Sequence, residues 1–162
     1  MNTKDFIWWL EENSIGGMMT PLIDPVRRYN ERGQLTDFND DIPDLYAVGI
    51  RSIISLINAP GEEKIYESAG FEFLCSPIQH FQAPSIDQAL ELCKFIGKAP
   101  KAVLVTCEGG LGKTGTVLAC WLIFNGSSPQ KAIDKVRSCE AGAIESQQQL
   151  QFLFDFADHL AH

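Results

Sequence analysis

The chain has 162 residues, of which 45% are hydrophobic and 21% are charged, a size and composition that suit one soluble globular domain spanning residues 1–162. Thirteen basic and twenty-one acidic residues leave a net charge of −8, which argues against nucleic acid or an anionic membrane as the main partner. The five cysteines show no metal-ligand spacing, and no apolar run is long enough for a membrane span or a secretory signal, so a cytoplasmic location is expected.

Short apolar runs and helix-like segments alternate in the first half of the chain. Phe6–Leu10 and Ile15–Met19 predict two strands joined by a turn. Trp8 and Trp9 in the first run could line a substrate wall, or one could lie in the core and one at the edge. Residues 20–44, rich in proline and charge, predict a loop. The other elements predicted in this half are a short helix ending at Gly49, a strand at residues 52–57, a helix at 62–69 and a strand at 71–75.

Helical patterns dominate the second half. The S-x-x-Q pattern from Ser85 to Gln88 is typical of a capping box and predicts a helix that ends by Pro100. The other predicted elements are a strand at residues 102–106, a helix at 116–124, a helix that begins after Ser128 and a last helix that begins at Ser146. Strands that alternate with helices predict an α/β domain with a mostly parallel central sheet of about five strands flanked by helices.

The segment from Val103 to Thr116 has the layout of an anion site. A buried strand leads into a loop with three glycines in four residues, and a helix follows directly. Such a loop turns successive backbone N–H groups toward one point, and the helix N-terminus adds a positive dipole end there. Cys107 lies at the mouth of the loop, where this environment favours the thiolate. The residues predicted to bind phosphate are Glu108, Gly109, Gly110, Leu111, Gly112 and Lys113.

One motif that could explain this loop is the nucleotide-binding P-loop, G-x-x-x-x-G-K-[ST]. Gly112, Lys113 and Thr114 fit its second half, but Cys107 stands where its first glycine is required. The residues after Thr114 also predict helices alone, so no later strand could supply the aspartate that holds Mg²⁺ in such proteins. Nucleotide binding is therefore the third-ranked hypothesis.

The same loop, T-C-E-G-G-L-G-K-T-G, resembles the signature H-C-x-x-G-x-x-R-[ST]-G of the cysteine-dependent protein tyrosine phosphatase superfamily. Residues 49–56, 81–88 and 143–149 resemble, in the same order, further segments of its small atypical dual-specificity phosphatases. Relative to that family, the chain has an insertion near residues 24–40. The loop positions that match are Cys107, Gly110, Thr114 and Gly115, whereas Thr106 and Lys113 replace the family's His and Arg.

The resemblance implies a phosphatase that hydrolyses phosphate monoesters, of phosphotyrosine or mixed phosphoprotein substrates, as a monomer without metal or cofactor. Cys107 would attack phosphorus, and water would then hydrolyse the cysteinyl-phosphate. The hydroxyl of Thr114 could hydrogen-bond the sulfur and help it leave. Lys113 keeps the charge of the family's Arg but loses its planar, two-pronged geometry, and Thr106 replaces the family's His only in part.

The proton donor and the water-positioning group each have two interpretations. His80 stands where the family has its acidic Asp and could donate the proton to the leaving group. Asp87 is the alternative acid, although an acidic residue is expected in a first helical turn anyway. Gln149 matches the family's water-positioning glutamine, but it is also the third residue of the capping box that begins at Ser146.

Two further alternatives stay open at this point. Because the loop, its flanking His and the general acid all depart from the family pattern, the chain could be a pseudophosphatase that binds phosphorylated ligands without turnover. Cys75 could lie near Cys107 and protect it as a disulfide, or it could be a buried structural thiol, which is the favoured interpretation.

Overall fold

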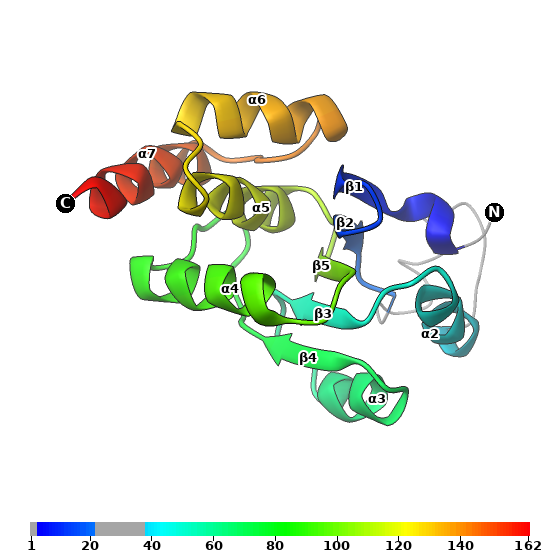
Figure 1. Cartoon of the computed structure of the whole chain (residues 1–162). Coiled ribbons are helices and arrows are strands. Elements are labelled where there is room, and N and C mark those ends of the chain that lie inside the picture. The colour runs from blue at the N-terminus through cyan, green and yellow to red at the C-terminus, as the bar shows by residue number, and fades with distance from the viewer. Residues whose placement is uncertain (1–2, 22–37) are drawn as a thin grey trace.

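In the computed structural model, which describes residues 3–21 and 38–162, helices cover a single five-stranded sheet (Figure 1). Residues 22–37 lie outside the described part of the chain, and they include most of the predicted loop at 20–44 and of the insertion predicted near 24–40. The elements are η1 (Thr3–Phe6), β1 (Trp8–Glu11), β2 (Ile15–Met19), α2 (Phe38–Ala47), β3 (Ser52–Ser55), α3 (Glu62–Ser68), β4 (Glu72–Cys75), α4 (Ile86–Lys98), β5 (Val103–Cys107), α5 (Gly112–Phe124), α6 (Pro129–Cys139) and α7 (Gln147–Ala161).

The strands lie in the order β1-β2-β5-β3-β4, and only β1 and β2 are antiparallel to each other. This confirms the predicted α/β domain with a mostly parallel sheet. The central strand β5 pairs Cys107 with Met19 of β2, and Thr106 with Ser55 of β3. The carboxyl ends of three parallel strands therefore meet at Cys107, and this edge is where open α/β sheets place their ligand sites.

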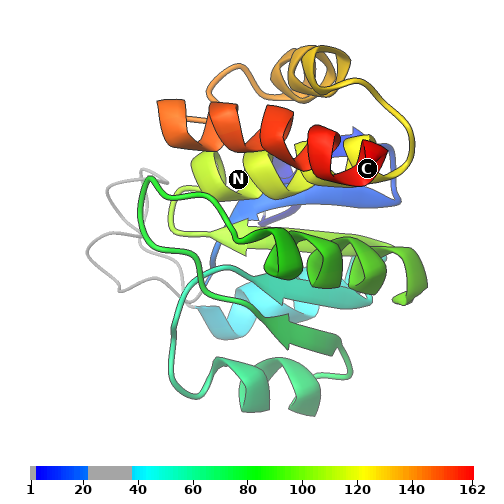
Figure 2. The same cartoon turned by 90° about the vertical axis from the view of Figure 1, so that its left-hand side faces the viewer.

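Alternating side chains of β5 divide the hydrophobic core between the two faces of the sheet. Val103 and Val105 join the larger cluster, which α4, α5, α6 and α7 complete. Leu104 joins the smaller cluster with residues of α2 and α3. The helix α5 is buried along most of its length, because α6 and α7 pack over its outer side (Figures 1 and 2). None of the helices in the described parts of the chain is long and apolar enough to cross a membrane.

The helix starts that carry a capping box agree with the prediction, but two other helix starts do not. The helix α2 begins at Phe38, inside the loop predicted for residues 20–44, and α5 begins at Gly112 and not at residue 116. Ser85 and Gln88 form a complete capping box at α4, and Ser146 and Gln149 form another at α7. The first strand begins at Trp8 and not at Phe6, because Phe6 ends the short η1 turn. The predicted strands at residues 52–57, 71–75 and 102–106 are found at 52–55, 72–75 and 103–107.

The strand order argues against a disulfide between Cys75 and Cys107. Cys75 pairs with Ser55 of β3, and β3 lies between β4 and β5. Two strand spacings place the two backbones about 10 Å apart, whereas a disulfide needs Cα atoms within about 7 Å. Cys75 is also exposed, and its thiol donates to the carbonyl of Ile57 at 3.4 Å, so the prediction of a buried thiol is wrong.

Candidate active site

The thiol of Cys107 is buried at the carboxyl end of β5 and receives two hydrogen bonds on its sulfur. The backbone N–H of Gly110 lies 3.2 Å from Sγ, and the hydroxyl of Thr114 donates from 3.1 Å. Hydrogen bonds to a sulfur stabilise its anionic form more than its neutral form. Two donors, one at each end of the loop's turn into α5, therefore converge on this one sulfur.

Gly110 can be no other residue without moving the loop. Its φ of +71° lies in the left-handed region, and a Cβ there would be 2.3 Å from the backbone nitrogen of Met19. The carbonyl of Gly110 accepts a hydrogen bond from the indole Nε1 of Trp8 at 2.9 Å. The opening hairpin thus fixes the curvature of a loop that lies 102 residues further along the chain.

The positions of Trp8 and Trp9 decide between the two interpretations of this aromatic pair. Its ring belongs to the larger core cluster, whereas Trp9 is half-buried against the smaller one. Neither ring lines the pocket described below, so the interpretation of a core ring and an edge ring is confirmed.

The cation of the loop is bound by a carboxylate of the same loop. Nζ of Lys113 lies 3.0 Å and 2.9 Å from the two carboxylate oxygens of Glu108, and the lysine is buried. Burial alone would raise the pKa of Glu108, but the hydrogen bond and charge of Lys113, together with the charge of His80, hold it below its usual value. Lys113 therefore has a fixed partner before any ligand enters.

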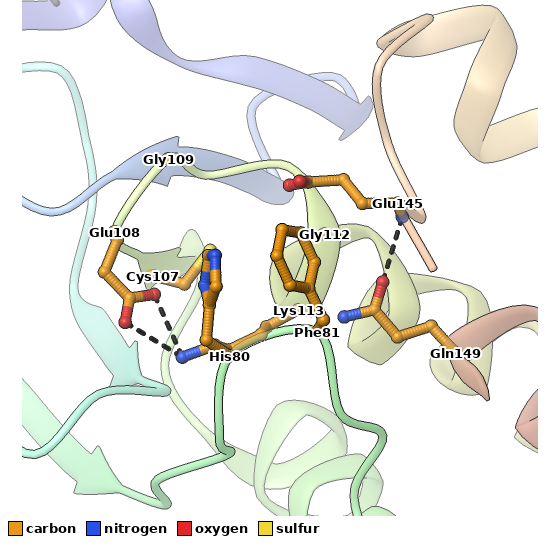
Figure 3. A pocket seen from close by; sticks show the side chains of 9 residues that line it. All are labelled: His80, Phe81, Cys107, Glu108, Gly109, Gly112, Lys113, Glu145 and Gln149. Atoms are coloured by element: carbon orange, nitrogen blue, oxygen red, sulfur yellow. Dashed lines mark hydrogen bonds and ion pairs between the residues drawn. The ribbon is translucent and has the colours of Figure 1, made fainter. Parts of the chain in front are cut away.

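A small pocket opens above the sulfur and gathers most of the predicted site residues (Figure 3). Two side chains that the sequence analysis left without a role, Phe81 and Glu145, also line it. Asp87, the alternative acid, lies in the first turn of α4 and does not line it, nor does Leu111. The lining residues are His80, Phe81, Cys107, Glu108, Gly109, Gly112, Lys113, Glu145 and Gln149.

His80 is carried by a loop that is fastened to the start of α7. Its ring lies against that of Phe81, with centroids 3.9 Å apart, and Phe81 has a φ of +61°, which is rare for a residue with a side chain. The carbonyl of Phe81 accepts from the hydroxyl of Ser146 at 2.6 Å. The strained backbone is thus held in place by a neighbouring element, as is common in ligand-binding loops.

Gln149 is buried, and its amide joins two loops. Its Oε1 accepts from the backbone N–H groups of Glu145 and Ser146 at 2.9 Å and 3.1 Å, and its Nε2 donates to the carbonyl of Gln82 at 3.1 Å. Three of its hydrogen-bonding positions are therefore used for structure. This geometry favours the capping interpretation, and it makes Gln149 the joint between the His80 loop and the segment that carries Glu145.

Thr106 does not hold the loop that follows Cys107. Its hydroxyl is buried and donates to the carbonyl of Ile54 at 3.0 Å, so it ties β5 to β3. The loop is held instead from the β1–β2 side, through Trp8. The bond from Trp8 to Gly110 leaves no pattern in the sequence, because the two residues are far apart in the chain.

Glu145 could have been found only in part from the sequence. It lies within residues 143–149, which resemble a segment of the family, but this resemblance does not show that its carboxylate reaches the loop. A Cβ on Gly112 would be 2.7 Å from Oε1 of Glu145, so the glycine that begins α5 leaves room for this carboxylate. The position of Glu145 therefore depends on a tertiary contact. Each of the two segments that make this contact can be recognised in the sequence, but the contact itself cannot.

Comparison with known proteins agrees with this geometry. Residues 29–127 match the family described as polymorphic toxin system, DSP-PTPase phosphatase. The chain belongs to this family. It therefore lies within the cysteine-based protein tyrosine and dual-specificity phosphatase superfamily that the loop resembles.

Relatives of this phosphatase family match most of the chain. Cyclin-dependent kinase inhibitor 3 of Rattus norvegicus is 31% identical over 126 residues, which cover 74% of this chain and 59% of that protein. Tyrosine-protein phosphatase cdc-14 of Caenorhabditis elegans is 28% identical over 127 residues, 75% of this chain and 18% of that protein. The chain thus spans less than two thirds of the length of either relative.

Solved structures give the same fold. Kinase-associated phosphatase with a serine in place of its catalytic cysteine is 25% identical, with a TM-score of 0.81 over 96% of this chain and 95% of that chain. Tk-PTP in its active form is 26% identical, with a TM-score of 0.71 over 94% of this chain and 97% of that chain. The helix-flanked sheet is therefore the fold of small dual-specificity phosphatases.

Proposed function

We propose that the protein hydrolyses phosphate monoesters of phosphoproteins, phosphotyrosine first among them, through a cysteinyl-phosphate on Cys107. The observation that carries this proposal is the sulfur of Cys107, which holds hydrogen bonds from Gly110 and Thr114 at the floor of a pocket. The loop at residues 108–111 and the N-terminus of α5, which begins at Gly112, offer backbone N–H groups and a positive dipole end to the phosphoryl oxygens. No metal ion or cofactor is needed for this chemistry.

In the first step, the thiolate of Cys107 attacks phosphorus and the bond from phosphorus to the ester oxygen breaks. The leaving oxygen takes a proton from His80, whose ring lines the same pocket. In the second step, the neutral His80 takes a proton from a water molecule as the water oxygen attacks phosphorus, the phosphorus–sulfur bond breaks, and the thiolate leaves. The N–H of Gly110 and the hydroxyl of Thr114 stabilise the charge that returns to the sulfur.

A second candidate, a phosphate-binding protein without turnover, is favoured by one specific contact. The ion pair between Lys113 and Glu108 competes with any phosphate for Lys113, the one lysine among the described residues that line the pocket. An ammonium group also binds the transition state with one strong contact where a guanidinium makes two. Nucleotide binding with Mg²⁺ is less favoured, because the residues from 112 to 162 form helices α5, α6 and α7 and no further strand.

The deciding experiment measures hydrolysis of para-nitrophenyl phosphate by the wild-type chain in the presence of a chelator, with Cys107→Ser as the control. Turnover that survives the chelator and disappears in the serine variant is the expected result. Metal-dependent turnover that persists in Cys107→Ser would refute the proposal. If turnover is absent but phosphate or vanadate raises the melting temperature, the second candidate replaces the first.

A further inference from the structure

The carboxylate of Glu145 lies at the rim of the phosphate pocket without a partner of its own. It lines the pocket together with Cys107 and Lys113, and the side chain is exposed. Within the described residues, no hydrogen bond or ion pair involves its carboxylate oxygens, although its backbone N–H is bound by Gln149. In Figure 3 it lies on the other side of Cys107 from the ion-paired Glu108. Among the described residues, a carboxylate without a hydrogen-bond or ion-pair partner thus lies beside the predicted phosphate site.

The backbone under this carboxylate is held firmly. Arg137 donates to the carbonyls of Ala143 and Ile144 at 3.2 Å and 2.9 Å, and Ile144 has a φ of +63°. Gln149 binds the N–H of Glu145 at 2.9 Å. Because the main chain is fixed on both sides of Glu145, only its side-chain torsions set where the carboxylate lies.

The effect of the Glu145 carboxylate on a ligand depends on the other charges around the pocket. Among the residues that the structure describes, no lysine or arginine other than Lys113 lines the pocket or the hollow beside it between residues 57–58 and 77–80. Lys113 is already neutralised by Glu108. A substrate that brings acidic groups next to its phosphate would meet the carboxylate of Glu145 at the rim, whereas a basic group there would find a partner.

We propose that Glu145 determines substrate specificity by pairing with a cationic side chain adjacent to the phosphorylated residue of a phosphopeptide. The substrate class is then a phosphoprotein segment with lysine or arginine beside the phosphoresidue. This inference rests on the proposed function, because it assigns the substrate class of the same phosphate site.

The test measures binding, so that it does not depend on turnover. The Cys107→Ser protein is titrated with two phosphotyrosine peptides of equal length, one with lysines and one with glutamates on both sides of the phosphotyrosine. The lysine peptide is expected to bind about threefold to tenfold more tightly, a range set by one partly exposed charge pair. This ratio is expected to fall as the salt concentration rises.

Substitution of Glu145→Gln in the same background is expected to remove most of that ratio. The matched control is Glu91→Gln on the exposed side of α4, which changes the net charge equally and should leave the ratio unchanged. Equal affinity for the two peptides, or a ratio that survives Glu145→Gln, overturns the inference alone. If neither peptide binds to the folded protein, the proposed function and the inference both fail.

Discussion

At the scale of single residues, Thr114 offers a way to separate the two chemical steps. Its hydroxyl donates to the sulfur of Cys107 at 3.1 Å, and this bond is worth most when the sulfur carries full charge, as it does when it leaves phosphorus. We expect Thr114→Val to slow breakdown of the cysteinyl-phosphate by about one to two orders of magnitude, because one hydrogen bond to a charged group is worth roughly 1.5–3 kcal/mol. Rapid-mixing measurements with para-nitrophenyl phosphate should show a larger initial burst followed by slower steady turnover.

The control for this experiment is Thr114→Ser, which keeps the hydroxyl and removes only a methyl group. It should retain a burst and a steady rate close to those of the wild type. Equal slowing of the burst and of the steady phase in Thr114→Val would mean that the hydroxyl acts on both steps alike, contrary to the assignment.

At the scale of elements, the contact between α5 and residues 143–145 holds the rim of the pocket. A Cβ on Gly115 would be 2.7 Å from Cβ of Ala143 and 2.9 Å from the nitrogen of Ile144. Because the backbone of Ile144 is fixed by Arg137, we expect Gly115→Ala to push the two elements apart and to lower the free energy of unfolding by about 1–3 kcal/mol. Urea denaturation followed by circular dichroism measures this change.

A glycine in the neighbouring helix provides the comparison. At Gly97 of α4, a Cβ would lie 3.6 Å from the ring of Trp121, which is ordinary van der Waals contact. Alanine there should be neutral or stabilising by up to about 1 kcal/mol, because glycine is a poor helix former. Similar stability changes in both variants would show that helix propensity, and not the packing of α5 on residues 143–145, governs the result.

How far the sequence predicts these elements depends on the range of the interactions that form them. Capping boxes such as Ser85 with Gln88 are local in the chain, and the structure contains them as predicted. The loop from Cys107 to Thr114 is local as well, and its glycines indicate its shape. Contacts such as Trp8 with Gly110 join segments that no periodicity relates, so only the folded chain reveals them.

The role of Gln149 illustrates a second limit. The sequence leaves two interpretations open, because a glutamine at that spacing suits both a helix cap and a water-positioning role. The distances to Glu145, Ser146 and Gln82 favour the cap, since the amide is largely occupied. A motif match identifies the residue, but hydrogen-bond geometry is needed to assign its role.

At the scale of the whole molecule, one buried acid makes stability depend on pH. Glu62 in the first turn of α3 is only 2% exposed. Burial raises the pKa of its carboxyl, and the hydroxyls of Ser55 and Thr20 beside it lower it by less. The folded state therefore holds the proton more tightly than the unfolded state does. The resulting stabilisation is full below the unfolded pKa and is lost as the pH rises through the folded pKa.

From this sign we expect Glu62→Gln to have a higher free energy of unfolding than the wild type at pH 8, because a neutral amide replaces a buried carboxyl that would have to ionise there. The gain should shrink at pH 5, where more of the wild-type carboxyl is protonated. Unfolding in urea at both pH values measures the difference. A gain from Glu62→Gln that is equal at both pH values would contradict the assignment.

The central place of β5 links the chemistry of the protein to the order in which it folds. The hairpin β1–β2 and the β3–α3–β4 unit share no strand pairing, and β5 alone joins them. As the chain is synthesised, both of these units emerge before β5 does, so the sheet stays in two pieces until β5 is inserted. Cys107 arrives at the end of that same strand. Cys107 therefore reaches its place between the ends of β2 and β3 only when the last gap in the sheet closes.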